Sequence, residues 1–336
     1  MADVGLGQVV TTTGRARSKV LKSATLDSQP ILAMMKEVGG IRRIDGGRTV
    51  VEEAKSGQNG SVAWVGEAGS VSLADSKVLD AAEFNWSYQL GSVVWTLAER
   101  LKNSGSSDTK IIDVVAGKFD VLEDTMKNYF HEGVLSNGTG TGGLQLGGLA
   151  ALVSTTPTTG TVGGIDRSNA NAAWHRNQKF DTANDWSDGA VDASNVKRFL
   201  DKGLNATARN SKLNATAGVL GQIHFEALTQ ATQAIQVITN ESSTGKVGFD
   251  KQVYRGVPMY FGGGINYSGA SALTTTRTYL LNLKPGGVNL VFHEKAEFEM
   301  LEPVDSNDQA AISRLMFTMA AMTIGGLAKT CWVGFD

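Results

Sequence analysis

Cysteine and proline are scarce in this sequence, and charge of either sign is close to balance. The single cysteine, Cys331, excludes an intramolecular disulfide. We expect it to act as a small buried apolar residue near the end of a strand. The chain has 5 prolines against 40 glycines, so its loops are expected to change shape readily. A formal net charge of -2 over 336 residues argues against a protein that binds polyanions over its whole surface.

Long apolar runs and targeting signals are also lacking. The longest mostly apolar window, Leu315–Ala328, is too short and too interrupted by glycine to cross a bilayer. The first residues do not have a charged segment followed by an apolar one, which is the pattern of a secretion signal. We therefore expect a soluble protein without a membrane partner that is made in a reducing cytoplasm.

Residue patterns typical of catalysis, cofactors and metals are missing as well. The four histidines stand in no spacing typical of a zinc site, and no Gly-x-Ser-x-Gly motif is present. Gly138, Gly140 and Gly143 match the dinucleotide-binding fingerprint, but that site needs a strand before the glycines, where this sequence predicts a helix. Glu52 and Glu53 point to opposite faces of a strand, and we expect both to be solvated. We predict no catalytic residue, no cofactor and no metal.

The most informative feature that is present is a long β-hairpin, predicted over residues 41–97. Its outgoing strand is the run Arg48–Ala54, and its returning strand is the run Phe84–Leu90. The connecting tip, residues 55–80, is rich in glycine, serine and alanine and carries several turn signals. Because an isolated two-stranded ribbon is marginal in water, this hairpin needs another surface to lie on.

The aromatic residues of the hairpin indicate which surface has to be covered. Phe84, Trp86, Tyr88 and Leu90 fall on every second residue, so they are expected to share one face of a strand. We predict that the three aromatic residues, together with Trp64 in the tip, contact a neighbouring subunit. A role in stacking nucleic-acid bases would require interleaved lysine and arginine, which this strand lacks.

A small group of basic residues marks the N-terminal segment, residues 1–40. Its members are Arg15, Arg17, Lys19 and Lys22. Apolar periodicity is weak here, so we expect an extended arm rather than a folded element. We predict that the four basic residues contact a neighbouring subunit. Contact with nucleic acid and a solvated tail are the alternatives.

A long helix is predicted from Asp108 to Ser136, because apolar residues recur there in steps of three and four. Its length would be about 43 Å at 1.5 Å per residue. Asn137–Gly138 supplies a left-handed end signal. Over residues 136–164 the composition changes to glycine and threonine, which indicates a boundary.

Beyond this boundary, helix and strand patterns alternate. Helices are predicted at 192–209 and 224–238, and strands at 217–223 and 253–261. The last third of the chain is rich in strand signals, which fall at Tyr279–Leu283, Val288–Phe292, Phe298–Leu301 and Arg314–Trp332. Two adjacent glycines at 325–326 predict a bulge in the last of these strands.

This order of parts resembles the major capsid protein of tailed double-stranded DNA phages, the Hong Kong 97-type fold. The resemblance covers nearly the whole chain. Gly143-Leu144, Gly163–Ser168 and Trp174–Asn177 are similar to strings that mark the start of the axial domain in a subgroup of these proteins. Tyr279–Leu283 and Phe298–Pro303 are similar to the last strands of the family.

The resemblance implies an α+β fold with a fixed division of the chain. Residues 1–40 would be the N-arm and residues 41–97 the extended loop. Residues 98–142 would form the spine helix of the peripheral domain and residues 143–287 the axial domain. Residues 288–336 would supply the closing strands of the peripheral domain, with an end that could return to the axial domain.

The resemblance also implies a structural protein and not an enzyme. Such subunits self-assemble into the hexamers and pentamers of an icosahedral phage head that encloses double-stranded DNA, so the expected location is the virion, after assembly in the bacterial cytoplasm. The implied partners are further copies of the chain, a separate scaffolding protein, a portal, DNA held by weak contact and, as an option, a decoration protein. Two alternatives remain open, an encapsulin-type compartment shell and a soluble two-domain enzyme.

Overall fold

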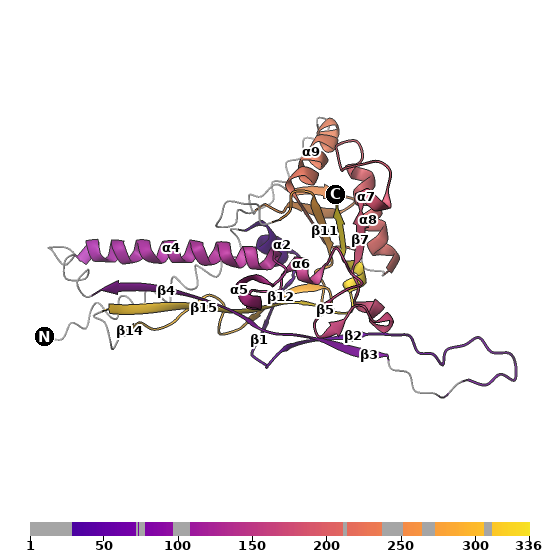
Figure 1. Ribbon diagram of the computed structural model, residues 1–336, viewed down its shortest axis with the longest axis horizontal. Coiled ribbons are helices and arrows are strands. Elements are labelled where there is room, and N and C mark those ends of the chain that lie inside the picture. Colours follow the sequence, from indigo (N-terminus) through magenta and orange to yellow (C-terminus); the bar gives the residue numbers. More distant parts are fainter. Residues whose placement is uncertain are drawn as a thin grey trace.

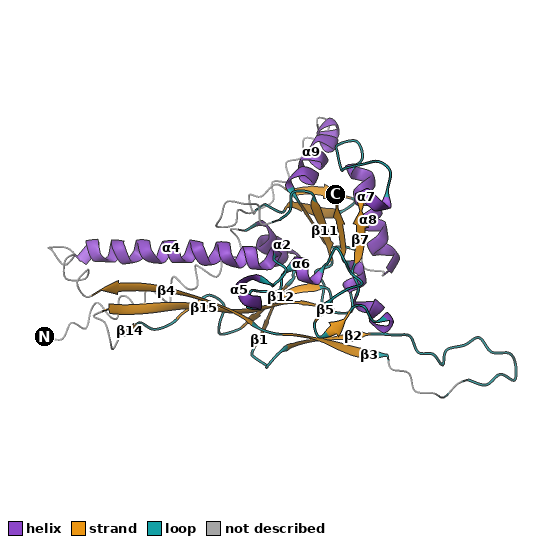
Figure 2. Ribbon diagram, in the orientation of Figure 1, coloured by secondary structure: helices purple, strands orange, loops and turns teal. Residues whose placement is uncertain are grey.

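A computed structural model describes residues 29–71, 73, 78–96, 108–210, 214–236, 251–263, 273–305 and 311–336. These residues form a mixed α+β fold with two six-stranded sheets and two short two-stranded ones. A thin blade that contains the longest helix extends to one end of the molecule, and a β-hairpin extends to the opposite end (Figure 1). The second six-stranded sheet and its helices rise from the region between them (Figure 2).

The first sheet is built around one strand of 14 residues, β15 (Ala311–Ile324). Its central path runs β1 (Ile41–Ile44), β12 (Val288–His293), β15 and β13 (Glu299–Met300), while β4 (Ser87–Thr96) and β14 (Val304–Asp305) also pair with β15. β4 runs antiparallel to β15 along its whole length, from Ser87 opposite Ala320 to Thr96 opposite Ala311. Segments from the two ends of the described chain therefore meet in one sheet.

The helix α4 (Asp108–Leu135) covers one face of the β4–β15 pair. Its buried residues include Phe119, Met126, Phe130 and Val134, which are seven, four and four positions apart and therefore share one side of the helix. The ring of Trp95 on β4 meets the ring of Phe119 edge-on, with 6.2 Å between the centroids. Gln89 Nε2 donates a hydrogen bond to the carbonyl oxygen of Met126 at 3.0 Å. The long helix predicted from periodicity is confirmed.

The end of this helix is set by glycine. Gly138 has a φ of +77°, the left-handed conformation that the sequence predicted there. The chain then forms the short helices α5 (Gly140–Gly143) and α6 (Leu149–Leu152). Gly148 lies so close to the end of α4 that an added Cβ would be 2.3 Å from the carbonyl oxygens of Gly133 and Val134. The glycine-rich boundary is therefore a close packing of backbone against backbone.

The second sheet has a core of its own. Its strand order is β7 (Gln178–Asp181), β16 (Trp332–Phe335), β11 (Arg277–Leu281), β8 (Ala217–Leu220), β10 (Val257–Phe261) and β9 (Lys251–Tyr254). Helices α8 (Val196–Asn210) and α9 (Gln222–Gln236) pack against each other and contribute to this core. Phe199 and Trp332 lie at its centre, with 5.1 Å between their ring centroids.

The remaining described elements are short. They are α7 (Thr182–Asp185), the 3₁₀ helices η1 (Ala170–His175) and η2 (Ala328–Thr330), and the two-stranded pair β5 (Thr161–Val162) with β6 (Ile165–Asp166). Cys331 is fully buried directly before β16, as predicted, and burial raises its pKa to about 11.

Three expectations about elements are wrong. The arm expected to extend through residue 40 contains a helix, α2 (Pro30–Val38), whose five residues Ile31–Met35 are buried beside the second sheet. A continuous apolar run buried on all sides hides the period of a helix.

The strand expected at 253–261 is a tight hairpin of β9 and β10, which turns at Arg255 and Gly256, both with positive φ. The stretch 314–332 is not one strand, because the chain leaves the first sheet at the turn over 325–326 and enters the second.

We expect the contact between α4 and β4 to respond to a single methyl group. In Gly91→Ala the new Cβ would lie 2.5 Å from Leu122 Cδ1 and 2.9 Å from Met126 Sδ. Both atoms lie toward the ends of flexible side chains, so the free energy of unfolding should fall by only about 1 kcal/mol. The matched control is Gly117→Ala, which has open space around its Cβ on the exposed side of α4 and should raise that free energy by about 0.5–1 kcal/mol. Urea unfolding of the unassembled subunit, followed by circular dichroism, measures both. Equal effects would contradict this packing.

Candidate subunit interface

The hairpin that leaves the body is shorter than the sequence suggested. β2 (Val50–Lys55) and β3 (Leu79–Phe84) pair antiparallel from Val50 opposite Phe84 to Lys55 opposite Leu79. The flanking segments of the expected loop, in β1 and β4, belong to the first sheet instead. We use "the hairpin" for residues 50–84 and "the tip" for its described residues between β2 and β3.

A buried carboxylate fixes the root of the hairpin to the body. Glu52, on β2, is 6% exposed. It accepts hydrogen bonds from Arg42 Nη1 at 2.7 Å and from Thr323 Oγ1 at 2.9 Å, so it joins β2 to β1 and to the end of β15. Breaking one partner of a buried pair leaves an uncompensated charge, which is costly. The expectation that both Glu52 and Glu53 are solvated is therefore wrong for Glu52.

Two further contacts hold the returning side of the root. Trp86 Nε1 donates a hydrogen bond to the carbonyl oxygen of Gly47 at 2.9 Å, and its ring lies edge-on to His293. The backbone N–H of Glu83 donates to the carbonyl oxygen of Gly163 at 2.9 Å. A Cβ on Gly163 would lie 2.8 Å from the ring of Phe84, so glycine is required at this approach.

The predicted common face of the aromatic residues is wrong. Phe84 and Trp86 are only 8% and 7% exposed, whereas Tyr88 and Leu90 are 63% and 61% exposed. The reason is that the chain changes partner at Asn85 and Trp86, between β3, which pairs with β2, and β4, which pairs with β15. Phe84 and Trp86 therefore pack mainly inside their own subunit, and a contact of either residue with a neighbour stays a prediction.

Tyr88 belongs to an exposed apolar face of the first sheet, on the side away from α4. This outer face consists of Tyr88, Leu90 and Val94 on β4, with the partly exposed Leu315, Phe317 and Met319 on β15. The rings of Tyr88 and Phe317 stack with 6.1 Å between their centroids. Apolar residues that gather on one open sheet face are typical of a surface that another protein covers.

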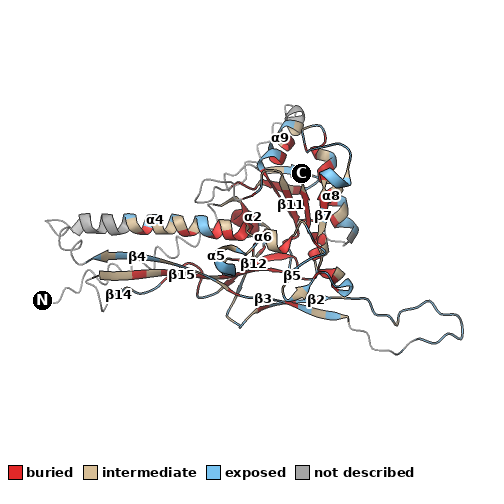
Figure 3. Ribbon diagram, viewed as in Figure 1, coloured by how far each residue is buried: buried red, intermediate tan, exposed pale blue. Residues whose placement is uncertain are grey.

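The tip is the second exposed apolar surface. Trp64 and Leu73 are almost completely exposed to solvent, and Val62 is 83% exposed. The tip is coloured exposed along most of its described length in Figure 3, in contrast to the buried centre of the molecule. A contact of Trp64 with a neighbour stays a prediction, and so does one of Tyr88. Arg15, Arg17, Lys19 and Lys22 lie outside the described residues.

The strings Gly163–Ser168 and Trp174–Asn177 form a polar joint behind the hairpin. Arg167 is fully buried and donates from Nη2 to the carbonyl oxygen of Leu152 at 2.8 Å. Desolvation lowers its pKa to about 10. His175 is also fully buried, and desolvation, followed by the charge of Arg167, lowers its pKa to about 4. The joint thus holds a neutral histidine beside a buried cation.

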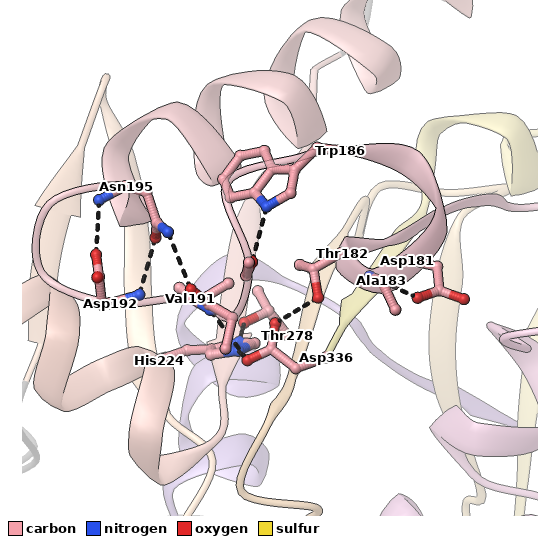
Figure 4. A network of polar contacts seen from close by, with 12 residues as sticks. Asp181, Thr182, Ala183, Trp186, Val191, Asp192, Asn195, His224, Thr278 and Asp336 are labelled. Carbon is pink, nitrogen blue, oxygen red and sulfur yellow. Dashed lines mark hydrogen bonds and ion pairs between the residues drawn. The ribbon is translucent and has the colours of Figure 1, made fainter.

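The arrangement most similar to a catalytic one lies in the second sheet (Figure 4). His224 Nδ1 is 2.8 Å from Thr278 Oγ1, and its Nε2 is 3.2 Å from Asp336 Oδ2, in the manner of a hydroxyl–imidazole–carboxylate triad. Thr278 and His224 are fully buried, so no substrate reaches the hydroxyl group. Asp336 also accepts from Thr182 Oγ1 and from the backbone of Val191. The network therefore ties β16, β11, α7 and α9 together.

Other kinds of site have little support in the described part of the chain. Within it, no three histidine, cysteine, aspartate or glutamate side chains gather in a way that could hold a metal ion. None of the helices that could be searched is long and apolar enough to cross a membrane. The glycines of the dinucleotide fingerprint follow α4 directly, so the strand that such a site needs before them is replaced by a helix.

No protein-family model and no curated protein matches this sequence. Solved structures do match. The capsid asymmetric unit of cyanophage A-1(L) is similar with a TM-score of 0.60 and 14% identity, over 90% of this chain and 92% of that chain. The capsid of a native GTA particle is similar with a TM-score of 0.55 and 12% identity, over 90% and 89%. The SrpI encapsulin complex of Synechococcus elongatus PCC 7942 is similar with a TM-score of 0.50 and 13% identity, over 90% and 86%.

At such low identity the similarity is one of fold. It covers nine tenths of this chain, so it extends over most of the architecture rather than one common substructure. The α+β fold of the Hong Kong 97 type, predicted from the order of the parts, is confirmed.

Trp86 and Trp64 should differ sharply in their effect on the subunit. Trp86→Ala removes a buried ring and a hydrogen bond, so we expect the free energy of unfolding to fall by about 3–5 kcal/mol. Trp64→Ala removes a ring that touches little in the isolated chain and should change it by less than about 0.5 kcal/mol. Urea unfolding at a concentration that keeps the protein unassembled tests the pair. A stable Trp86→Ala subunit would show that this ring is not part of its own root.

His175 should contribute to a loss of stability in acid. Its pKa is lowered from 6.5 to about 4 in the folded chain, so between these values the unfolded chain binds a proton that the folded chain excludes. Stability is then complete above about pH 6.5 and declines as the pH falls, by up to about 3 kcal/mol for this group. In His175→Gln the slope of stability between pH 6.5 and pH 4 should be smaller than in the natural chain. An unchanged slope would assign the acid sensitivity to other groups, such as His131 and His224, whose pKa values burial also lowers.

Proposed function

We propose that this chain is the major structural subunit of a phage head, which self-assembles into hexamers and pentamers of an icosahedral shell around double-stranded DNA. The observation that carries the proposal is the hairpin, which is anchored firmly at its root and bears an uncovered apolar tip. This occurs in a fold shared, over nine tenths of the chain, with the capsid subunit of a cyanophage.

The physical argument is that one copy cannot cover its own exposed apolar groups. The tip and the blade point to opposite ends of the molecule (Figure 1), so the hairpin of one chain does not reach the outer face of the same chain. Each large apolar side chain that leaves water contributes about 1.5–3 kcal/mol. Placing the hairpin of one copy on the outer face of the next buries Trp64 and Leu73 together with Tyr88 and Leu90. Repetition of this contact around a ring gives closed assemblies.

In this proposal each of the two six-stranded sheets belongs to a different domain of the capsid subunit. The blade of α4, β4 and β15 would form the peripheral domain, and the second sheet with α8 and α9 would form the axial domain around the centre of each capsomer. The N-terminal arm, with Arg15, Arg17, Lys19 and Lys22, would extend to a neighbour. The net charge of -2 is consistent with a shell that contacts packaged DNA only weakly.

The further partners in this proposal are a separate scaffolding protein, a portal and, as an option, a decoration protein, and the location is the virion. These follow from the proposed role in a phage head. They are tested by the composition of purified particles.

An encapsulin-type compartment shell is the second candidate. The specific observation in its favour is the match to the SrpI encapsulin, which has the same TM-score of 0.50 as the match to mycobacterium phage Che8. The contents of particles made in the native host distinguish the two, because a phage head protects DNA from nuclease and an encapsulin encloses a cargo protein. A soluble enzyme has no comparable observation, since the hydroxyl group of the triad-like network is fully buried.

We expect charge on the outer face to block assembly without unfolding the subunit. Tyr88→Asp with Leu90→Asp places two carboxylates on the exposed side of β4, where each apolar side chain is more than half exposed in the single chain. The natural chain should sediment as large particles and appear as rings or shells in negative stain, whereas this variant should remain small with an unchanged far-ultraviolet spectrum. The matched control is Val121→Asp, on the exposed surface of α4, which should still assemble. A natural chain that remains a monomer at high concentration would overturn the proposal.

A further inference from the structure

Beside β4 the blade carries a groove of about 430 Å³ that the described chain leaves open. It lies between the start of β4, the last turns of α4 and the α5 turn. Its exposed apolar side chains are Tyr129 and Leu144, which are 50% and 74% exposed, and Tyr88 borders it at the edge of β4. The volume is in the range of pockets that take up a single small organic group.

The wall of the groove has hydrogen-bonding capacity that none of the described residues uses. Gln89 and Thr318 both line it and stand directly opposite each other in the pairing of β4 with β15. Gln89 Nε2 is held by the carbonyl oxygen of Met126, which leaves Gln89 Oε1 as a free acceptor. Gln89 Oε1 and Thr318 Oγ1 are buried, and no described residue forms a hydrogen bond with either. Buried polar atoms are normally paired, so two adjacent exceptions indicate a missing partner.

The chain itself offers a side chain with the matching chemistry. An indole ring is apolar over most of its surface and carries one N–H donor. Trp64 presents such a ring at the tip, fully exposed. The outgoing limb of the hairpin, from Val50 to Gly66, spans at most about 50 Å at 3.3 Å per residue, and it points away from the blade of its own chain (Figure 1). Only a second copy can therefore bring Trp64 to the groove.

We propose that the groove between β4, α4 and α5 receives Trp64 from the hairpin tip of a neighbouring copy of this chain. This inference rests on the proposed function and names the receiving site for the hairpin. The groove lies on the α4 side of β4 and the outer face on the opposite side. Among the described strands β4 pairs only with β15, so its other edge is open and the two surfaces meet there, beside Tyr88.

The charges of the two surfaces are consistent with this contact. Glu67 is the only charged residue among the described residues of the tip, and Glu132 is the only one that lines the groove. The contact of Trp64 itself is thus carried by apolar area and by a hydrogen bond from the indole N–H rather than by ion pairs, since the other charged residues between β2 and β3, Asp75 and Lys77, are at least eleven positions away in the sequence. It should be insensitive to salt compared with a contact made by basic and acidic patches.

The test uses paired cysteines in assembled particles. The only natural cysteine, Cys331, is fully buried and does not compete. The variant Trp64→Cys with Leu144→Cys should give, on oxidation, a ladder of covalent oligomers on a non-reducing gel. The matched control, Trp64→Cys with Val121→Cys, places the second thiol on an exposed part of α4 outside the groove and should give at least about tenfold less.

A second measurement keeps Trp64 in place in case the double variant does not assemble. In Leu144→Cys alone, the thiol should react with a maleimide in the free subunit and be protected at least about tenfold in particles, and Trp64→Ala in the same chain should remove the protection. Protection together with the ladder supports the proposal.

Particles in which Leu144→Cys stays reactive, or in which the two cysteine pairs cross-link equally, would overturn the assignment of the groove while leaving the shell function intact. A natural chain that forms no particles would instead overturn the shell function itself. The two failures are therefore distinguishable.

Discussion

The pairing of β4 with β15 is the interaction on which the rest of the structure depends. Ten residues of β4 lie along β15, and β12, β13 and β14 pair with the same strand. This one strand therefore fixes the position of the hairpin root, of α4 and of the chain that leads into the second sheet. Because β4 is held along its entire length, the segment before it leaves the body at a defined place. The hairpin therefore begins and ends at fixed positions on the first sheet.

The root and the tip of the hairpin are suited to different kinds of contact. The root is held by buried polar contacts, among them the carboxylate of Glu52 between Arg42 and Thr323. Such contacts specify direction, because hydrogen bonds and ion pairs depend on geometry. The tip has apolar groups and almost no charge, which provide attraction without strict direction. A chain built in this way presents its exposed apolar surface in a defined direction, while the attraction of that surface still tolerates small differences in how a partner is placed.

The sequence predicted those parts of the fold that leave a periodic pattern. The long helix was found because one side of α4 packs on the sheet and the other meets water, so its apolar residues keep the helical period. The break at Asn85 and Trp86 was missed because aromatic alternation continues through it, although the strand partner changes there. The helix α2 was not predicted, because Ile31–Met35 are all buried and the sequence therefore lacks the alternation of apolar and polar residues that marks an amphipathic helix. In the candidate interface, the exposed Trp64 and Tyr88 were among the residues singled out, whereas Glu52 and the pair of Gln89 and Thr318 owe their surroundings to segments far away in the chain and left no local signal.

The interleaving of distant segments also governs the order of events during synthesis. β15 follows β4 by more than two hundred positions in the sequence, and β16 completes the second sheet only after β15 has been made. Neither sheet can therefore close before β15 and β16 have been synthesised, and long-range pairing of this kind forms slowly. A chain synthesised only as far as β14 therefore lacks the strand that orders β4, so neither the outer face nor the fixed root of the hairpin exists before β15 has been made.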